Sequence, residues 1–412
     1  MAVLRLQGSK PQERFWMSQA RARAFVGGIG SGKTMAGCAE VFRPEYAGAT
    51  GAFVAPTFPM LRDATLRTFL ALCETCQKQG WPVLTAFRRA DMVAELATGA
   101  TVLFRSADDP DRLRGPNLGF FYLDEAAMMS RLTWDIMLGR LREKPGRSWL
   151  TTTPRGFNWI YDLFVTQALD GYEIIRSSSR DNPFLPPDFV GTLEQAYAGQ
   201  FRQQEIEGEF VQPEGALAQR QWFGIVDAVP HHARRVRFWD FAATEKKLSS
   251  DDPDFTAGVK MAYADGIYYV EHVVQKRLNP GDVDRLVLQT AQADGQDVEI
   301  GIEQEPGASG KGMAAYMIRL LSGYNVRATP ASGDKVTRAM PWFAQAQAGN
   351  VKLLRAAWNS DYLDEVTMFP IGAHDDMVDA TSGAFGRIVA GGGPIQRDVL
   401  PAKFTNYAGL TA

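Results

Sequence analysis

The sequence predicts an α/β protein with two domains, and three observations support this prediction. The chain has 412 residues, enough for two cores of ordinary domain size. In the first half, short apolar runs alternate with helical patterns, which is typical of a mostly parallel sheet. The pattern loses its periodicity at 208–235 and then a second α/β unit begins. We therefore expect domains at 1–207 and 236–390, a linker at 208–235 and a flexible tail at 391–412.

The composition is that of a soluble globular protein, with 45% hydrophobic and 22% charged residues. No apolar run reaches the roughly 18 residues of a membrane span, and the N-terminus has no signal-peptide pattern. The net charge of −3 does not by itself indicate nucleic-acid binding, but basic residues cluster at 112–114, 140–147, 234–237 and 246–247. Such clusters form either a basic channel or ordinary solvated faces.

The three cysteines are compatible with a reducing compartment. Cys73 and Cys76 stand alone, without the second pair or the histidines that a zinc site needs. They lie in a predicted helix at 65–79, where residues three apart share a face. We therefore expect Cys73 and Cys76 to pack in the core.

The first chemical motif is Gly27–Thr34, which fits the pattern G-x-x-x-x-G-K-[ST] of a loop that binds nucleotide phosphates. A predicted strand at 22–26 precedes it and a predicted helix at 35–42 follows, so phosphates would lie at a helix N-terminus. Glycines allow backbone N–H groups to face the phosphates, a lysine supplies positive charge, and a threonine hydroxyl ligates Mg²⁺. The loop residues expected to bind ATP and Mg²⁺ are Gly27, Gly30, Ser31, Gly32, Lys33 and Thr34.

A second motif in the same domain is an acidic strand end. After a strand at 51–57 and a hairpin formed by 92–96 and 101–106, the apolar run 118–125 ends in Asp124 and Glu125. Downstream of a phosphate loop, this is the Walker B pattern. We expect Asp124 to hold the Mg²⁺ shell and Glu125 to polarise the attacking water.

The next predicted strand, at 148–150, leads into Thr151–Pro154. Threonines at this strand end can contact the γ-phosphate or its water and transmit its loss to neighbouring segments. The run is equally compatible with a β-forming stretch stopped by proline. Thr152 is the residue expected to contact the nucleotide.

The second half carries acidic residues at the ends of predicted elements. The strand at 236–241 contains Asp240, and the strand at 298–303 ends in Glu303, with a hairpin at 255–274 between them. A predicted helix running towards residue 388 begins with His374, Asp375, Asp376 and Asp379.

Carboxylates beside apolar strands are costly to bury unless a cation neutralises them. Asp376 and Asp379 share a helix face, and such a set can hold two divalent metals that clamp a phosphodiester. Capping of the helix by its first acids is the alternative interpretation. Lys335 or Arg338 could neutralise the scissile phosphate, or could lie on a solvated helix face. The acids expected to bind Mg²⁺ or Mn²⁺ are Asp240, Glu303, Asp375, Asp376 and Asp379.

With these motifs in order, residues 12–387 resemble the large terminase subunit of tailed bacteriophages, the motor that packages viral DNA. The resemblance implies an N-terminal P-loop ATPase and a C-terminal nuclease of RNase H-like fold. Thr152, Thr153 and Pro154 match the family's coupling motif. Gln12 is similar to its adenine-contacting glutamine, and Arg114 resembles an arginine finger supplied to a neighbouring subunit.

In the nuclease half, Asp240 and Glu303 match the family's first two metal-binding acids, and the segment 374–380 matches the third. Catalytic residues implied by the resemblance are Glu125, Arg114, Asp240, Glu303 and Asp376. Which of Asp375, Asp376 and Asp379 contact metal stays open.

From this resemblance we expect the chain to have two activities. As a motor it would use ATP to move double-stranded DNA into a procapsid, and as a metal-dependent endonuclease it would cut the DNA concatemer. The implied partners are DNA, the small terminase subunit and the portal protein, in the host cytoplasm and without a membrane. A finger acting in trans implies a ring of subunits. The alternatives are a DNA helicase or translocase with an inactive RNase H-like module, and a non-enzymatic assembly protein that only binds nucleotide.

Overall fold

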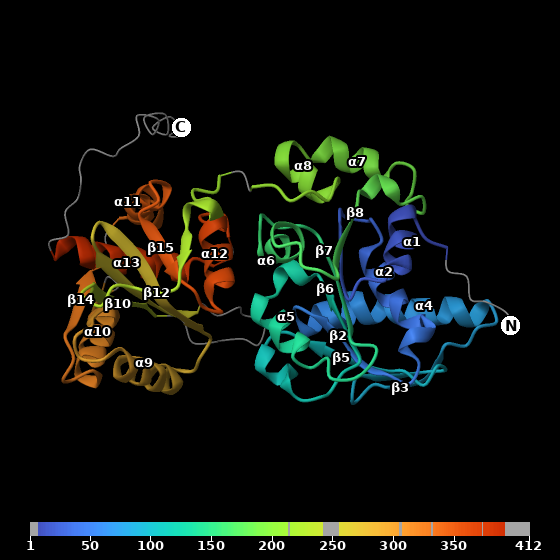
Figure 1. The fold of residues 1–412 in the computed structure, drawn as a ribbon, viewed down its shortest axis with the longest axis horizontal. Helices are drawn as coiled ribbons and strands as arrows, with labels where there is room; N and C mark the ends of the chain where they lie inside the picture. Colours follow the sequence, from blue (N-terminus) through green and yellow to red (C-terminus); the bar gives the residue numbers. More distant parts are fainter. Residues whose placement is uncertain are drawn as a thin grey trace. The chain divides into compact units, whose positions relative to one another are not determined.

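The computed structural model describes residues 7–212, 215–241, 255–304, 307–330, 333–372 and 374–391. The chain divides into two compact units, Met1–Glu214 and Gly215–Ala412 (Figure 1). Apart from Gly391, the expected tail lies outside the described residues. None of the described helices is both long and apolar enough to cross a membrane.

The first unit is built on an eight-stranded sheet in the order β3-β4-β5-β2-β6-β7-β1-β8. Its strands pair in parallel except for β3–β4 and β4–β5. The strands are β1 (Ala22–Gly27), β2 (Thr50–Ala55), β3 (Leu84–Arg88), β4 (Val93–Leu96), β5 (Thr101–Ser106), β6 (Phe120–Asp124), β7 (Arg147–Thr152) and β8 (Tyr172–Ser177). The mostly parallel sheet predicted for this half is confirmed, whereas the edge strands β3 and β8 were not predicted.

Helices cover both faces of this sheet (Figure 1). One core cluster contains side chains of α1, α2 and α4, and a second contains side chains of α5 and α6. Because both faces are covered, every residue of β1 is buried, as is usual for a central parallel strand. The helices of this unit are α1 (Lys10–Met17), α2 (Lys33–Ala39), α3 (Phe58–Met60), α4 (Arg67–Lys78), α5 (Arg131–Leu138), α6 (Trp159–Tyr161), α7 (Phe189–Ala196) and α8 (Gly199–Glu205). Cys73 and Cys76 of α4 are buried free thiols, as their spacing predicted.

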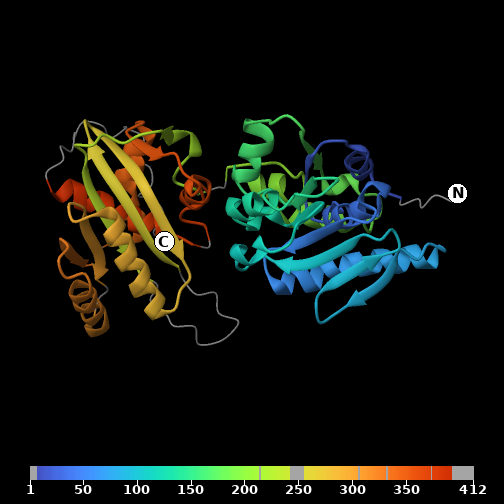
Figure 2. The same cartoon turned by 60° about the horizontal axis from the view of Figure 1, so that its bottom comes forward.

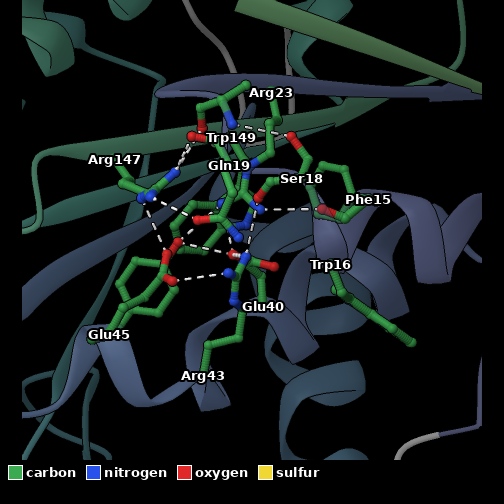
Figure 3. A network of polar contacts seen from close by, with 12 residues as sticks. Phe15, Trp16, Ser18, Gln19, Arg23, Glu40, Arg43, Glu45, Arg147 and Trp149 are labelled. Carbon is green, nitrogen blue, oxygen red and sulfur yellow. Dashed lines mark hydrogen bonds and ion pairs between the residues drawn. The ribbon is translucent and has the colours of Figure 1, made fainter. Parts of the chain in front are cut away.

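A buried ion pair joins β1 to the end of α2. Arg23 Nη2 lies 2.6 Å from Glu40 Oε1, and both side chains are fully buried. Tyr46 donates a 2.9 Å hydrogen bond to the same carboxylate, and Arg23 Nη1 donates to the Phe15 carbonyl oxygen (Figure 3). Arg23 therefore ties α1 and the segment after α2 to the strand that leads into the phosphate loop.

The second unit contains a seven-stranded mixed sheet in the order β14-β13-β10-β11-β12-β15-β9. β10, β11 and β12 form an antiparallel meander, and the remaining pairs are parallel (Figure 2). The strands are β9 (Gly224–Val226), β10 (Arg234–Asp240), β11 (Thr256–Ala264), β12 (Ile267–Lys276), β13 (Glu299–Gln304), β14 (Val326–Pro330) and β15 (Val351–Leu354). β9 lies within the expected linker 208–235 and pairs with β15, so part of that segment belongs to the sheet.

Two cores lie on opposite faces of this second sheet. α9 (Pro280–Asp294) and α10 (Ala308–Leu320) contribute to one, together with Trp239, and α11 (Lys335–Gln347), α12 (Asn359–Met368) and α13 (Asp376–Ala390) contribute to the other. α13 lies close against β10 because Gly383 leaves room for Phe238. A Cβ at Gly383 would fall 2.3 Å from the Phe238 ring. This close packing places the start of α13 near the end of β10.

We predict that Arg23→Ala lowers the free energy of unfolding of the first unit by about 3–5 kcal/mol, because it leaves Glu40 as a buried charge without its main partner. Urea denaturation of the full chain would measure this. The matched control is Arg14→Ala, since the Arg14–Glu173 pair is exposed and such pairs contribute little. Equal destabilisation by the two variants would contradict the prediction.

Candidate functional sites

The register of three parallel strands assembles the first site. β7 lies between β1 and β6, so that Thr151 is level with Asp124 on one side and with Phe25 on the other. The carboxyl ends of β1, β6 and β7 therefore meet at one edge of the sheet. The phosphate loop follows β1 directly, and so it reaches the two acids that follow β6.

The phosphate loop has the backbone that its glycines predict. Gly30 and Gly32 have φ angles of 73° and 83°, in the left-handed region where other residues are strained. Lys33 is buried, and its Nζ donates a 3.2 Å hydrogen bond to the Gly28 carbonyl oxygen. Ser31 Oγ donates to the same oxygen at 2.7 Å. This cradle at the start of α2 fits the phosphates of a nucleotide in shape and charge.

Asp124 is buried and accepts hydrogen bonds from three hydroxyl groups. Thr34 Oγ1 donates at 3.2 Å, Thr65 Oγ1 at 2.7 Å and Thr151 Oγ1 at 2.7 Å. These bonds orient the carboxylate towards the threonine of the phosphate loop, so that two oxygen groups of the kind that suits Mg²⁺ lie side by side. Thr65 was missed by the sequence analysis because nothing in its local pattern reveals that it meets Asp124.

Glu125 follows Asp124 with a φ of 50°, an uncommon conformation for a residue other than glycine. Its carboxylate lies 3.7 Å from Lys33 Nζ and accepts a 3.3 Å hydrogen bond from the Thr153 N–H. Burial raises the pKa of Glu125, and the neighbouring Lys33 opposes this shift. The acid, the loop lysine and the threonine run are thus in direct contact.

The other residues predicted for the nucleotide site are placed differently. Thr152 Oγ1 is buried and accepts a 3.0 Å hydrogen bond from the Ala127 N–H, so Thr151, one residue earlier, is the threonine that contacts Asp124. Gln12 Nε2 donates at 3.0 Å to the Gly32 carbonyl oxygen, at the edge of the loop. Arg114 has 54% of its side chain exposed and pairs with Asp111 at 2.8 Å.

A later segment of the first unit supports the phosphate loop from outside, which the sequence did not reveal. The Ile29 N–H donates a 2.6 Å hydrogen bond to the Glu205 carbonyl oxygen. Ser179 Oγ donates to the Ile29 carbonyl oxygen and Asn182 Nδ2 to that of Gly30, both at 2.6 Å. The loop conformation is therefore coupled to the segment that contains α7 and α8.

The second site forms where β10 and β13 end side by side. These strands pair in parallel with Trp239 level with Ile302, so Asp240 and Glu303 are neighbours one residue further on. Burial raises the pKa of Asp240 well above its usual value, and the charges of Asp379, Glu303 and Asp376 raise it further. The fold therefore brings together acids that are more than sixty residues apart in sequence.

Two cations of α11 lie among these acids. Arg338 bridges Glu303 Oε1 at 2.7 Å and Asp379 Oδ1 at 2.9 Å. Lys335 Nζ lies 2.6 Å from Asp375 and 2.9 Å from Asp379 Oδ2. Both were candidates for phosphate contacts in the sequence, and in the structure both neutralise the carboxylates.

Carboxylate oxygens are ligands that suit Mg²⁺ and Mn²⁺, so the chemistry of this set fits the metals expected here. Its arrangement differs from a formed metal centre. Within the described part of the chain, no group of three or more His, Cys, Asp or Glu side chains is arranged to hold a metal ion. Ion pairs with Arg338 and Lys335 instead engage Glu303, Asp375 and Asp379.

Glu365 of α12 is a further residue that the sequence analysis missed. Its Oε1 accepts hydrogen bonds from the backbone N–H groups of Met377 at 2.6 Å and Val378 at 3.2 Å, in the first turn of α13. Gln275 Nε2 donates to the other oxygen at 3.0 Å. Burial, with Asp376 nearby, raises the pKa of Glu365 to about 8. Asp375, the N-cap residue, makes no side-chain capping bond, so Glu365 caps the helix instead.

These features define the class of protein: a nucleotide-binding unit of the P-loop type followed by a mixed-sheet unit with acids at neighbouring strand ends, as in RNase H-like folds. Comparison with known families agrees with this. Residues 24–225 match the family model of the N-terminal part of the T4likevirus-type terminase large subunit. Residues 237–386 match the terminase RNaseH-like domain. The two models together span most of the chain, and the chain belongs to the large terminase subunit family.

Two curated relatives are large terminase subunits. That of Thermus virus P23-45 is 31% identical over 179 residues, which cover 39% of this chain and 37% of the relative. That of Thermus phage G20c is 44% identical over 69 residues, 16% of this chain and 14% of the relative. The aligned segments thus span well under half of the length of either relative.

Among solved structures, the large terminase of a thermophilic bacteriophage in complex with ADP aligns with 94% of this chain and 100% of its own. The identity is 16% and the TM-score 0.46. The nuclease of the large terminase from thermophilic phage G20c, with bound zinc, aligns with 41% of this chain and 95% of its own, at 12% identity and a TM-score of 0.31.

We predict that Glu365→Ala lowers the free energy of unfolding by about 1–3 kcal/mol, because two helix N–H groups lose their acceptor. It should also weaken Mn²⁺ binding to the full chain, measured by calorimetry, because α13 carries Asp376 and Asp379. Glu365→Gln is the matched control, since its carbonyl oxygen can accept the same bonds. Unchanged Mn²⁺ affinity in the alanine variant would show that Glu365 does not position these acids.

Proposed function

We propose that this chain hydrolyses ATP to drive double-stranded DNA into a procapsid and cleaves DNA with a metal-dependent nuclease. The observation that supports this most is the presence of both sites in one chain. Asp124 and Glu125 adjoin the phosphate loop, and the carboxylates around Asp240 lie at the ends of β10 and β13. We place the ATPase in 1–207 and the nuclease in 236–390, with 208–235 connecting them and 391–412 as a tail.

In the ATPase, the phosphates would occupy the loop formed by Gly27, Gly30, Ser31 and Gly32, with Gln12 at the adenine. Lys33 would turn from the Gly28 carbonyl to the β- and γ-phosphates. Thr34 and Asp124 would hold Mg²⁺, which neutralises charge on the phosphates when bound. Glu125 would orient and polarise the attacking water.

The threonine run at 151–153 would transmit the effect of ATP hydrolysis to neighbouring segments. Thr153 donates its N–H to Glu125, and Thr152 accepts the N–H of Ala127 in the turn that follows Glu125. A shift of Glu125 would therefore move the backbone after β7. Arg114 is exposed, as a finger for a neighbouring subunit must be, which supports a ring of subunits as the working form.

In the nuclease, Asp240 and Glu303 with acids of α13 (Asp376, and Asp375 or Asp379) would hold one or two Mg²⁺ or Mn²⁺ ions. Such ions activate a water and stabilise the leaving oxygen. Arg338 and Lys335 would leave their carboxylate partners and neutralise the scissile phosphate. As further partners we propose the small terminase subunit and the portal protein, at the procapsid in the host cytoplasm.

Glu125→Ala should leave ATP binding largely intact and lower turnover by orders of magnitude, because only the positioning of water is lost. Steady-state phosphate release and a fluorescent-nucleotide binding assay would separate the two effects. Lys33→Ala should weaken binding itself. Near-normal turnover in Glu125→Ala would refute this site.

The same phosphate-release assay tests whether Arg114 is an arginine finger. Arg114→Ala and Glu125→Ala proteins each keep what the other lacks, so mixing them should restore part of the activity if Arg114 acts in trans. The control is a mixture of Lys33→Ala with Glu125→Ala, in which every subunit has a defective nucleotide site of its own. No rescue above this control, in an assembled ring, would contradict the finger.

Asp240→Ala in the full chain should abolish plasmid nicking and leave ATP turnover unchanged, because it removes a metal ligand far in sequence from the phosphate loop. Nicking should need Mg²⁺ or Mn²⁺ and fail with Ca²⁺, which accepts looser geometry. Without metal, the variant should melt at the same or a higher temperature, because repulsion with Asp379, Glu303 and Asp376 is relieved. Undiminished nicking would overturn the metal assignment.

A further inference from the structure

A basic cavity lies at the edge of the first sheet opposite the phosphate loop. It has a volume of about 460 Å³, and its polar lining consists of Gln19, Arg21, Arg142, Glu143, Lys144 and Arg147. Arg21 directly precedes β1 and Arg147 begins β7, so the cavity adjoins the amino ends of these strands. The phosphate loop follows the carboxyl end of β1, about 20 Å away for a strand of this length. A ligand in the cavity would therefore not compete with nucleotide.

One wall of the cavity is rigidly held. Arg147 Nη1 donates to the carbonyl oxygens of Gln19 at 2.6 Å and Ala20 at 3.0 Å, and its Nε lies 3.1 Å from Glu45. Glu45 also pairs with Arg43 at 2.8 Å, and Arg43 pairs with the buried Glu40. Figure 3 shows this chain of contacts running from Arg147 to the core. The wall is thus connected to the Arg23–Glu40 ion pair.

The remaining cations of the cavity are available to a ligand. Arg21, Arg142 and Lys144 are exposed. Arg142 uses its Nε for the Gly139 carbonyl oxygen, and within the described part of the chain Arg21 and Lys144 form no ion pair. Glu143 is the one acid in the lining, against four basic residues, of which Arg147 is paired with Glu45. This local excess of positive charge contrasts with a net charge of −3 for the whole chain.

The lining favours a phosphate-bearing partner over a protein surface. Interfaces between proteins are enriched in aromatic residues at their centre, whereas Leu141 and Pro145 are the apolar side chains that line this cavity. Interfaces with DNA are polar and strongly positive, and arginine side chains bind phosphate through two parallel hydrogen bonds. Contacts of this kind hold DNA without reading its sequence, which is what a translocating protein needs.

We propose that this cavity binds backbone phosphates of double-stranded DNA through Arg21, Arg142 and Lys144, with Arg147 as its fixed wall. The proposal rests on the proposed function as a DNA-translocating ATPase and assigns it a DNA-contacting surface. The cavity lies at the amino ends of β1 and β7, and the nucleotide site lies at their carboxyl ends. DNA bound in the cavity would therefore act on the same two strands as bound ATP.

The test measures binding of a fluorescein-labelled 30-base-pair duplex to the full chain by anisotropy over a series of salt concentrations, with Ca²⁺ in place of Mg²⁺ to prevent cutting. Arg21→Glu/Lys144→Glu should weaken binding at least tenfold. It should also reduce the slope of log K against log salt by about 1–2, because one or two phosphate contacts are lost. Arg67→Glu/Lys78→Glu on α4 carries the same change in charge and is the matched control, expected to change affinity less than threefold.

Three results would overturn the proposal. Unchanged affinity in Arg21→Glu/Lys144→Glu would exclude the cavity, and equal weakening in the control would show only a general effect of charge. If the wild-type chain fails to bind duplex DNA, the proposed function fails with it. Nucleotide affinity and the melting temperature, measured for each variant, show whether it is folded. If Arg21→Glu/Lys144→Glu misfolds, the milder Arg21→Gln/Lys144→Gln variant is tested in its place. It is expected to weaken DNA binding about threefold or more.

Discussion

Both sites depend on the register of neighbouring parallel strands. Parallel pairing makes strands end at the same edge, and the residues after those ends meet whatever their distance in sequence. In the first unit this brings Asp124 beside Thr151 and within reach of the loop after β1. In the second it places Asp240 beside Glu303. A slip of one residue in either pairing would turn these side chains to the other face of the sheet.

Placing acids together in a partly buried position has an electrostatic cost. The groups that stabilise the acids differ between the two units. Asp124 is satisfied by three neutral hydroxyl groups, which orient it without neutralising its charge. Around Asp240 the acids are neutralised by Arg338 and Lys335 from α11. In the first site Asp124 is thus held by hydroxyl groups, and Lys33 lies 3.7 Å from the neighbouring Glu125. At the second, two cations of one helix pair with Glu303, Asp375 and Asp379.

The surroundings of the sites are supplied by segments that have no motif of their own. Glu205, Ser179 and Asn182 support the phosphate loop through its backbone. Glu365 caps the helix that carries Asp376 and Asp379. Such residues act through hydrogen bonds to backbone groups, which place no demand on the sequence of the partner. For this reason they leave no pattern by which they could have been found.

The sequence by itself determined the α/β class, the central strands of both sheets, the phosphate loop and the acids at the strand ends. These follow from local physics: the period of apolar residues, the glycines that the loop conformation requires, and the cost of acids beside apolar strands. The edge strands β3 and β8 were not predicted, because they are only partly buried and lack a clear pattern of apolar residues. Only the tertiary structure decided that Thr151 and Thr65 contact Asp124. The same is true of Arg338 and Lys335, which neutralise the acids of the second site. It is also true of the cations near Arg147, which surround a cavity. These are contacts between residues distant in sequence, and they are set by strand register and helix packing, which no local pattern encodes.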